Sequence, residues 1–328
     1  MSKGDRVVVV IHPGSLGDVL LAVPALKGLR FRYPQHTVVL VASEGIGRLL
    51  QAYEIVDRVL PTEGAALTAL LAADLGVPPL WDTLLATCDL FVGWFRDDGA
   101  LANLCAHYGI GSVVIESPDS RNEMHQRDRF LASLQESLEP GPSPILDPLD
   151  RVRLRSGGLN RWQVILPSLE GRLILCHPGS GSLHKCVTAA VFHELIEGCR
   201  LAGYRPVIVA GPADERMVQA LEPSIREGTV IAKPPDLVGL AELLSLADGC
   251  VGHDSGVSHL AALLGVPTVA MFGPTDPRRW APQGNHVRVV SGESCRCQGW
   301  MAVQACAEKS CLPRSAKPVL AALNELLS

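Results

Sequence analysis

The sequence predicts an α/β protein with two parallel-sheet domains, and three observations support this prediction. Short apolar runs alternate with stretches of helical period along the whole chain, as in successive βα units. A buried strand followed by His-Pro-Gly-Ser and a helix occurs twice, at Val7–Ile11 with His12 and at Leu173–Cys176 with His177. The length of 328 residues corresponds to about two domains. We therefore expect two Rossmann-like halves.

The first half opens with a near-continuous run of β-branched residues, Val7–Ile11, and further short expected strands follow it. The expected strands are 7–11, 37–42, 56–60, 90–93 and 112–116, and the expected helices are 18–32, 44–53, 65–75 and 126–137. Residues 117–150 are polar and rich in proline, which is typical of a domain boundary. We place the first domain at residues 1–160.

The second half repeats the alternation of strands and helices. The expected strands are 173–176, 206–210, 229–232, 249–252 and 268–272, and the expected helices are 189–202, 215–221, 237–247, 257–264 and 318–327. The second domain is placed at 161–315, and the terminal segment 316–328 contains the last helix. In open parallel sheets, ligands bind beyond the carboxyl ends of the strands, so we expect a site in a cleft between the domains.

Composition and charge exclude several classes of protein. Apolar residues make up 47% of the chain, charged residues make up 19%, and the net charge is -5, which argues against disorder, a coiled coil and nucleic-acid binding. The sequence shows neither a membrane span nor a signal peptide, so we expect a cytoplasmic protein. Residues 1–150 hold 11 basic and 19 acidic side chains, whereas residues 151–328 hold 18 and 15. A polyanionic ligand is therefore expected on the second half.

The first candidate site is the turn Gly14-Ser-Leu-Gly17-Asp18, between a strand and a helix. Glycines let the backbone approach a ligand closely, and the amides at a helix start favour anions. Asp18 lies on the first helical turn, where it could be a general base or an ordinary helix cap. The spacing of a phosphate P-loop is absent.

Two further loops could bind an anion. In the loop 177–185, Ser180, Gly181, Ser182 and Lys185 could surround a phosphate, although the loop could also be a flexible Gly/Ser segment with a solvated lysine. The other loop, 252–259, opens a helix with Asp254, Ser255 and Gly256, followed by His259. Both His253 and His259 could equally be structural histidines.

Four of the ten cysteines lie within 17 residues, at Cys295, Cys297, Cys306 and Cys311. The C-x-C spacing fits the usual zinc pairs poorly. Reduced thiols, a metal site and disulfides all remain open at this point.

Together these motifs resemble glycosyltransferase family nine, the ADP-heptose lipopolysaccharide heptosyltransferases. The segments that resemble the family are 16–26, 177–185, 211–215 and 252–277, in the family's order and over almost the whole chain. The resemblance implies a GT-B fold: an N-terminal acceptor domain and a C-terminal nucleotide-sugar domain face a central cleft, and the last helix crosses back to the first domain.

The resemblance also implies inverting, metal-independent transfer that requires no cofactor, most simply of heptose from ADP-heptose to a glycan such as the lipopolysaccharide core. Asp18 matches the general base, and Ser180, Ser182 and Lys185 match the diphosphate loop, in which Lys185 offsets charge on the leaving ADP. The donor site is completed by residues that match the family's donor-binding positions: Gly17, Gly181, Glu215 near the ribose, Asp254, Ser255, Gly256 and His259.

Two departures concern the substrates. Lys185-Cys-Val-Thr replaces the family's usual Lys-Arg-Trp-Pro, so a donor contact can differ. The acidic first half disfavours a strongly anionic acceptor such as Kdo-lipid A and favours a neutral glycan or a protein. A lipid-linked glycan acceptor would bring the chain to the inner face of the membrane. The alternatives are a transferase with another donor, a GT-B epimerase and a non-catalytic nucleotide-sugar-binding protein.

Overall fold

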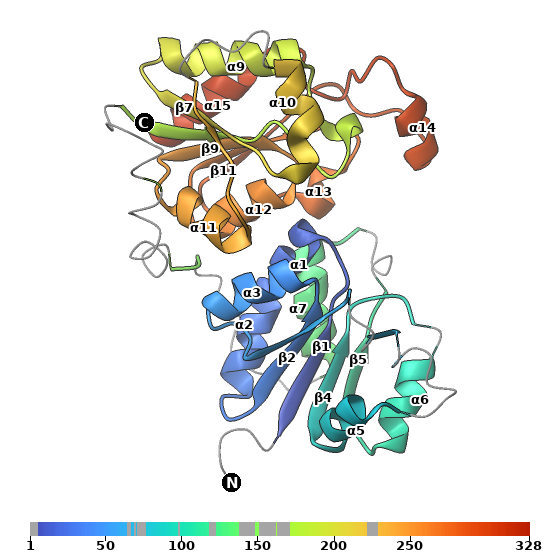
Figure 1. Ribbon diagram of the computed structural model, residues 1–328. Helices are drawn as coiled ribbons and strands as arrows, with labels where there is room; N and C mark the ends of the chain where they lie inside the picture. The colour runs from blue at the N-terminus through green and yellow to red at the C-terminus, as the bar shows by residue number, and fades with distance from the viewer. Residues whose placement is uncertain are drawn as a thin grey trace. The chain divides into compact units, whose positions relative to one another are not determined.

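The computed structural model consists of two compact units, Met1–Asp147 and Pro148–Ser328, each with its own parallel sheet (Figure 1). The described residues are 6–63, 67–68, 70, 77–97, 99–117, 123–137, 148–150, 162, 171–221 and 229–328. The two parallel sheets confirm the predicted α/β class. The division after Asp147 precedes the predicted boundary at residue 160, which lies outside the described residues.

The sheet of the first unit has the order β3-β2-β1-β4-β5, and all its strands run parallel. Its strands are β1 (Val7–Ile11), β2 (Thr37–Ala42), β3 (Arg58–Pro61), β4 (Cys88–Gly93) and β5 (Ser112–Ile115). All five residues of β1 are buried, because helices cover both faces of a central parallel strand. The order of the strands reverses between β1 and β4, which makes their carboxyl ends the favoured place for a ligand.

The helices whose bounds the structure describes in the first unit are α1 (Leu16–Leu21), α2 (Val23–Arg32), α3 (Glu44–Ala52), α5 (Pro79–Ala86), α6 (Ala100–His107) and α7 (Gln126–Ser137). The single helix expected over 18–32 is instead two helices. Helix α1 ends at Ala22, whose N–H donates a hydrogen bond to Val19 O, three residues back. Pro24 has no N–H and therefore cannot continue the series of helical hydrogen bonds. Helices α5 and α6 were not predicted, and most of the helix expected over 65–75 lies outside the described residues.

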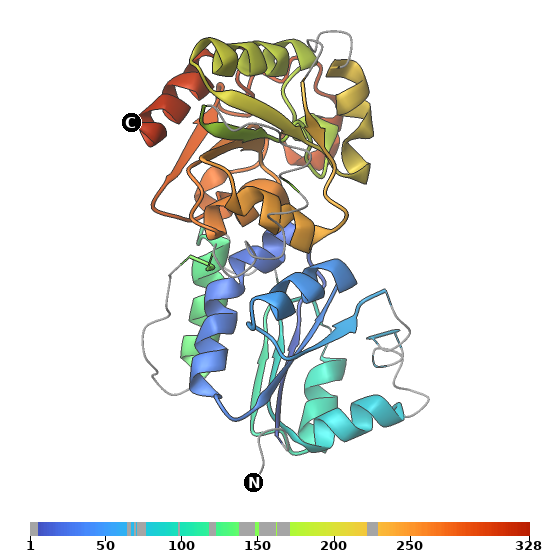
Figure 2. The same cartoon turned by 60° about the vertical axis from the view of Figure 1, so that its left-hand side comes forward.

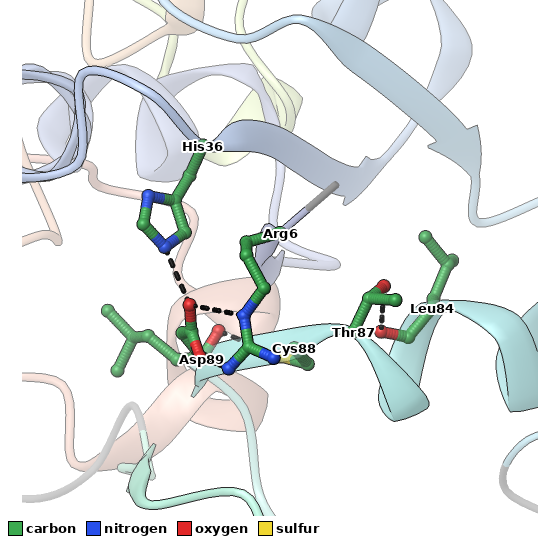
Figure 3. A network of polar contacts seen from close by, with 7 residues as sticks. Arg6, His36, Leu84, Thr87, Cys88 and Asp89 are labelled. Atoms are coloured by element: carbon green, nitrogen blue, oxygen red, sulfur yellow. Dashed lines mark hydrogen bonds and ion pairs between the residues drawn. The ribbon is translucent and has the colours of Figure 1, made fainter. Parts of the chain in front are cut away.

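Polar side chains connect neighbouring strands at the amino ends of the strands of this sheet (Figure 3). The carboxyl ends, where a ligand is expected, lie at the opposite edge. Asp89, at the start of β4, accepts from Arg6 Nε at 2.8 Å and lies 2.7 Å from His36 Nε2. Burial, followed by the charge of Arg6, lowers the pKa of His36. Arg6 directly precedes β1 and His36 directly precedes β2, so Asp89 joins three neighbouring strands. This position suits a stabilising role.

The sheet of the second unit has the order β11-β10-β9-β6-β7-β8 and is also parallel. Its strands are β6 (Leu173–Cys176), β7 (Arg205–Val209), β8 (Ile231–Ala232), β9 (Gly249–His253), β10 (Thr268–Phe272) and β11 (Val287–Ser291). The order reverses between β6 and β9. The edge strand β11 was not predicted, because its residues are half-buried or exposed and form no buried apolar run.

The helices of the second unit are α9 (Ala189–Leu201), α10 (Glu215–Leu221), α11 (Leu237–Ser245), α12 (Gly256–Leu263), α13 (Pro277–Trp280), α14 (Gly299–Ala305) and α15 (Lys317–Leu327). The C-terminal helix α15, drawn in red, lies beside α9 (Figures 1 and 2). Its residues Val319 and Leu323 are fully buried in the same core as Ile174 of β6. The helix is therefore part of the second unit's core, and its expected contact with the first unit stays a prediction.

In the described part of the chain, no helix is both long and apolar enough to cross a membrane.

Candidate functional site

The candidate site of the second unit lies where the strand order reverses. The loop 177–182 follows β6, and Asp254 and Ser255 follow β9, the neighbouring strand. A backbone bond from His177 N to Val251 O, 2.8 Å long, holds the two strand ends together. This is the edge at which open α/β sheets bind ligands.

Two contacts join these loops at Asp254. Lys185 Nζ donates to Asp254 Oδ2 at 2.7 Å, and Ser180 Oγ donates to the backbone carbonyl of Asp254 at 2.5 Å. The Asp254 side chain is 9% exposed, whereas that of Lys185 is 24% exposed. The structure therefore brings together Ser180, Lys185 and Asp254, which were predicted to belong to one site, and leaves the Lys185 side chain partly exposed.

Helix α12 begins directly beside this ion pair. Gly256 is its first residue and Ser255 is its N-cap, but the Ser255 side chain makes no hydrogen bond to the helix amides. Uncapped amides at a helix start carry partial positive charge and attract anions. His259 lies buried on the first turn of α12, and its backbone N–H bonds to Ser255 O at 3.2 Å.

Ser255 is engaged elsewhere, at the end of a buried chain of three side chains. Its Oγ lies 3.3 Å from His177 Nδ1, and His177 Nε2 lies 3.1 Å from Asp214 Oδ2. Asp214 also accepts from Gly211 N at 2.7 Å. Burial alone would raise the pKa of the Asp214 carboxyl, but the hydrogen bond and charge of His177, with the Gly211 amide, lower it.

Asp214 is absent from the predicted site residues, although its local sequence offered a signal. Gly211-Pro-Ala-Asp214 places an acidic residue three positions after the glycine that follows β7, and in the structure Asp214 Oδ2 accepts from Gly211 N while Asp214 N donates to Gly211 O at 3.0 Å. Gly179 supports the arrangement, because a Cβ at this position would overlap Oδ1 of Asp214. Glu215, the predicted ribose-binding residue, is the exposed first residue of α10, and its role stays a prediction.

The remaining predicted residues of this loop are closer to solvent. Ser182 Oγ accepts from His184 N at 3.3 Å, and Gly181 is exposed. Behind the loop, His253 is fully buried and accepts from Val187 N at 3.1 Å through Nε2. Burial, followed by the charge of His177, lowers the pKa of His253 to about 3. His253 is thus a neutral structural histidine.

In the first unit, Asp18 forms a capping box at the start of α1. Asp18 Oδ2 accepts from Ser15 N at 2.9 Å and from Ser15 Oγ at 2.7 Å. Asp18 is half-buried, and Gly17 lies beside it in α1. The geometry confirms that Asp18 caps the helix, and a role as a base is compatible with this cap because both contacts use the same oxygen.

His12 lies beneath the Asp18 turn in an aromatic environment. Its ring centroid is 5.9 Å from that of Trp94 and 5.2 Å from that of Phe130, and its Nδ1 accepts from Gly14 N at 3.2 Å. Burial, followed by the charge of Arg129, lowers the pKa of His12 to about 3. A neutral imidazole therefore holds the turn that precedes Asp18.

All ten cysteines are free thiols. Among the residues that the structure describes, no group of three or more His, Cys, Asp or Glu side chains could hold a metal ion. In the tail, the backbone of Lys309, followed by the Cys297 side chain, lowers the pKa of Cys306 through hydrogen bonds. The tail also contacts the loop 177–185, because Lys309 Nζ donates to Leu183 O at 3.0 Å.

The chain is similar to a known family of proteins and to a curated relative. Residues 153–309 match the model of glycosyltransferase family 9, which is described as a heptosyltransferase family. A curated relative, lipopolysaccharide heptosyltransferase 1 of Pseudomonas aeruginosa, is 26% identical over 293 residues, covering 82% of this chain and 79% of the relative.

Solved structures show the same fold. The ADP-heptose lipopolysaccharide heptosyltransferase II of Escherichia coli matches with a TM-score of 0.74 and 20% identity, covering 98% of each chain. The E. coli heptosyltransferase WaaC with ADP matches with a TM-score of 0.64 and 22% identity, covering 97% of this chain and 99% of that one. The fold of this chain is therefore that of the GT-B heptosyltransferases.

Proposed function

The chain belongs to glycosyltransferase family 9, and on this premise we propose that it transfers heptose from ADP-heptose to a glycan acceptor such as the lipopolysaccharide core. In the proposed reaction, the acceptor hydroxyl attacks the anomeric carbon, the bond from that carbon to the diphosphate oxygen breaks, and ADP leaves. The configuration at this carbon is inverted, and no metal or other cofactor takes part.

One observation supports a donor site most strongly. Lys185, Ser180 and the start of α12 converge on Asp254 at the point where the strand order reverses. This arrangement places a partly exposed ammonium group beside uncapped helix amides, and both favour a diphosphate. As ADP leaves, its charge grows, and a fixed cation at Lys185 would stabilise that charge.

We assign the general base to Asp18. Both hydrogen bonds between Asp18 and Ser15 use Oδ2. With respect to the described residues, Oδ1 is therefore available to accept the proton of an acceptor hydroxyl. The capping box fixes the carboxylate in one orientation, which a base needs.

The acceptor is proposed to be less anionic than Kdo-lipid A, either a neutral glycan or a protein. Two of the arginines near the carboxyl edge of the first sheet are already engaged: Arg127 donates to Asp128 at 2.8 Å, and Arg129 is 1% exposed and donates to Gln126 Oε1 at 2.6 Å. A competition assay with Kdo-lipid A tests this proposal. Saturable transfer to Kdo-lipid A would contradict it.

The donor proposal is tested by thermal stabilisation with ADP, UDP, GDP and ADP-heptose at one concentration. Binding to the native state alone raises the melting temperature, so the shift reports affinity. We expect ADP and ADP-heptose to give the largest shifts. A larger shift with UDP or GDP would indicate a different donor nucleotide and leave the proposal of a transferase in place. No shift with any of the four would favour a non-catalytic protein.

A further inference from the structure

Lys309 lies in the tail of the second unit, and its ammonium group reaches the loop that carries Lys185. Its Nζ donates to Leu183 O at 3.0 Å, two residues before Lys185. We propose that Lys309 is a second cation that binds the diphosphate of the donor and stabilises the nucleoside diphosphate as it leaves. This inference rests on the proposed donor site and extends it to a residue that lies outside the predicted site motifs.

The charges of the proposed site leave a diphosphate incompletely balanced. Lys185 and Asp254 form an ion pair, so together they contribute no net charge. The start of α12 contributes about half a positive charge, whereas ionised ADP carries about three negative charges. A further cation that faces the ligand would therefore strengthen its binding through charge-assisted hydrogen bonds.

Lys309 can supply this charge because no carboxylate in the described part of the chain neutralises it. The structure records a hydrogen bond from its ammonium group to Leu183 O and no ion pair with any described residue. An ammonium group has three N–H donors, and the carbonyl of Leu183 uses one of them. With respect to the described residues, the other two can donate to phosphate oxygens.

Two further observations place the tail beside Lys185. Burial raises the pKa of the Cys186 thiol to about 12, and the positive charges of Lys309 and Lys185 act against this rise. Both ammonium groups therefore lie near the same thiol. Trp300 of α14 approaches the same lysine, since Lys185 Nζ lies 6.0 Å from the centre of its ring.

The backbone of Lys309 also indicates a role for its side chain. Its φ is 44°, in the left-handed region that glycine adopts without strain and a lysine rarely adopts. This turn is held by Leu312, which is buried in the core of the unit and whose N–H donates to Lys309 O at 3.0 Å. Strained positions of this kind are concentrated at functional sites. The strain is thus a second observation, independent of charge, that points to Lys309.

The test is calorimetric titration of the whole protein with ADP and with adenosine, which lacks the phosphates, at several salt concentrations without divalent cations. Lys309→Gln removes the charge and Lys309→Arg keeps it. Lys317→Gln is the matched control, at an exposed lysine that begins α15. We expect Lys309→Gln to weaken ADP binding by about tenfold and to reduce its dependence on salt, because a charged hydrogen bond is lost. Lys309→Arg and Lys317→Gln should bind ADP nearly as the wild type does.

Lys309→Gly separates ligand binding from folding. Glycine relieves the left-handed backbone, so this variant should melt at or above the temperature of the wild type. It should nevertheless bind ADP as weakly as Lys309→Gln does. Weak binding in a protein that is fully folded would assign the loss to the missing ammonium group.

Adenosine should bind equally to the wild type and to all of these variants. Full ADP affinity in Lys309→Gln would overturn the inference alone. An equal loss of affinity for ADP and for adenosine would also overturn it alone, because Lys309 would then only anchor the tail to the loop. Absence of ADP binding by the wild type would overturn the proposed donor site together with the inference.

Discussion

Lys185 Nζ lies 2.7 Å from Asp254 Oδ2, although the two residues are 69 positions apart and follow different strands. The Asp254 side chain is buried and the Lys185 side chain is partly exposed, so the pair holds the lysine cation beside the start of α12. A diphosphate would meet an ammonium group that is already oriented, which lowers the entropy lost on binding.

Lys185→Ala is expected to weaken ADP binding by about tenfold or more, which corresponds to about 1.4 kcal/mol. It should also lower the melting temperature, because Asp254 is left buried without its partner. Stability and ADP affinity are measured in Lys185→Ala, Asp254→Asn and the double variant. The double variant should regain stability relative to Lys185→Ala but not ADP affinity, and full ADP affinity in Lys185→Ala would contradict the assignment.

Gly179→Ala should destabilise the protein by about 1–3 kcal/mol, the range for a disrupted buried polar group. A Cβ there would overlap Asp214 and displace its carboxylate from His177. Gly181→Ala, in the same loop, is the matched control for stability, since a Cβ at that position meets nothing within 4 Å. Chemical denaturation of both variants checks this, and equal losses would mean that the Asp214 contact does not depend on Gly179.

The strands were the most predictable part of the fold. The ranges Val7–Ile11, Thr37–Ala42, Leu173–Cys176 and Thr268–Phe272 agree in sequence and structure. Central parallel strands are buried on both faces and therefore appear as continuous apolar runs. The edge strand β11 carries Arg288 and exposed residues, so no such run exists there. The break between α1 and α2 at Ala22 depends on one backbone hydrogen bond, which the hydrophobic periodicity of the sequence does not reveal.

The grouping of three predicted residues could be anticipated from local sequence, while their roles stay predictions. Ser180, Lys185 and Asp254 lie in Gly- or Ser-containing loops after strands, and the structure brings them together. Asp214 was missed because its local sequence indicates only a turn cap, whereas its contact with His177, 37 positions away, forms on folding. Sequence reasoning favoured the neighbouring carboxylate Glu215, which is exposed. Which of two adjacent carboxylates faces the site depends on tertiary packing.

Stability should fall as the solution becomes acidic below pH 6.5. Burial lowers the pKa of His12 and of His253 to about 3, whereas both return to about 6.5 on unfolding. Between these values the unfolded chain binds more protons, so the stabilisation present above pH 6.5 is lost as the pH falls. Each histidine contributes a slope of up to about 1.4 kcal/mol per pH unit.

This is measured by chemical denaturation between pH 6.5 and 5, above the range in which most carboxylates titrate. His12→Asn retains an acceptor for Gly14 N–H and should reduce the slope, whereas His286→Gln should leave it unchanged. A slope unaltered by His12→Asn would show that His12 is not buried in its neutral form.

Cys306 should be the first thiol to react with iodoacetamide at pH 7. Hydrogen bonds from the Lys309 backbone and the Cys297 side chain lower its pKa, whereas burial raises the pKa of Cys250 to about 12. The site of alkylation is read by peptide mass spectrometry, with the unfolded chain as the control in which all ten cysteines react. Faster labelling of Cys297, or protection of Cys306 that a chelator removes, would contradict the assignment of plain thiols.

The most direct measurement of the central claim is the rate of transfer from ADP-heptose to a neutral core-glycan acceptor by Asp18→Asn, beside Ser15→Ala. Asparagine keeps an oxygen for the helix cap but cannot take a proton, whereas Ser15→Ala weakens the cap and leaves the base. We predict that Asp18→Asn loses transfer by at least about 100-fold while its ADP affinity changes by no more than a few fold, and that Ser15→Ala loses stability but retains transfer. Transfer by Asp18→Asn at the wild-type rate would contradict the account.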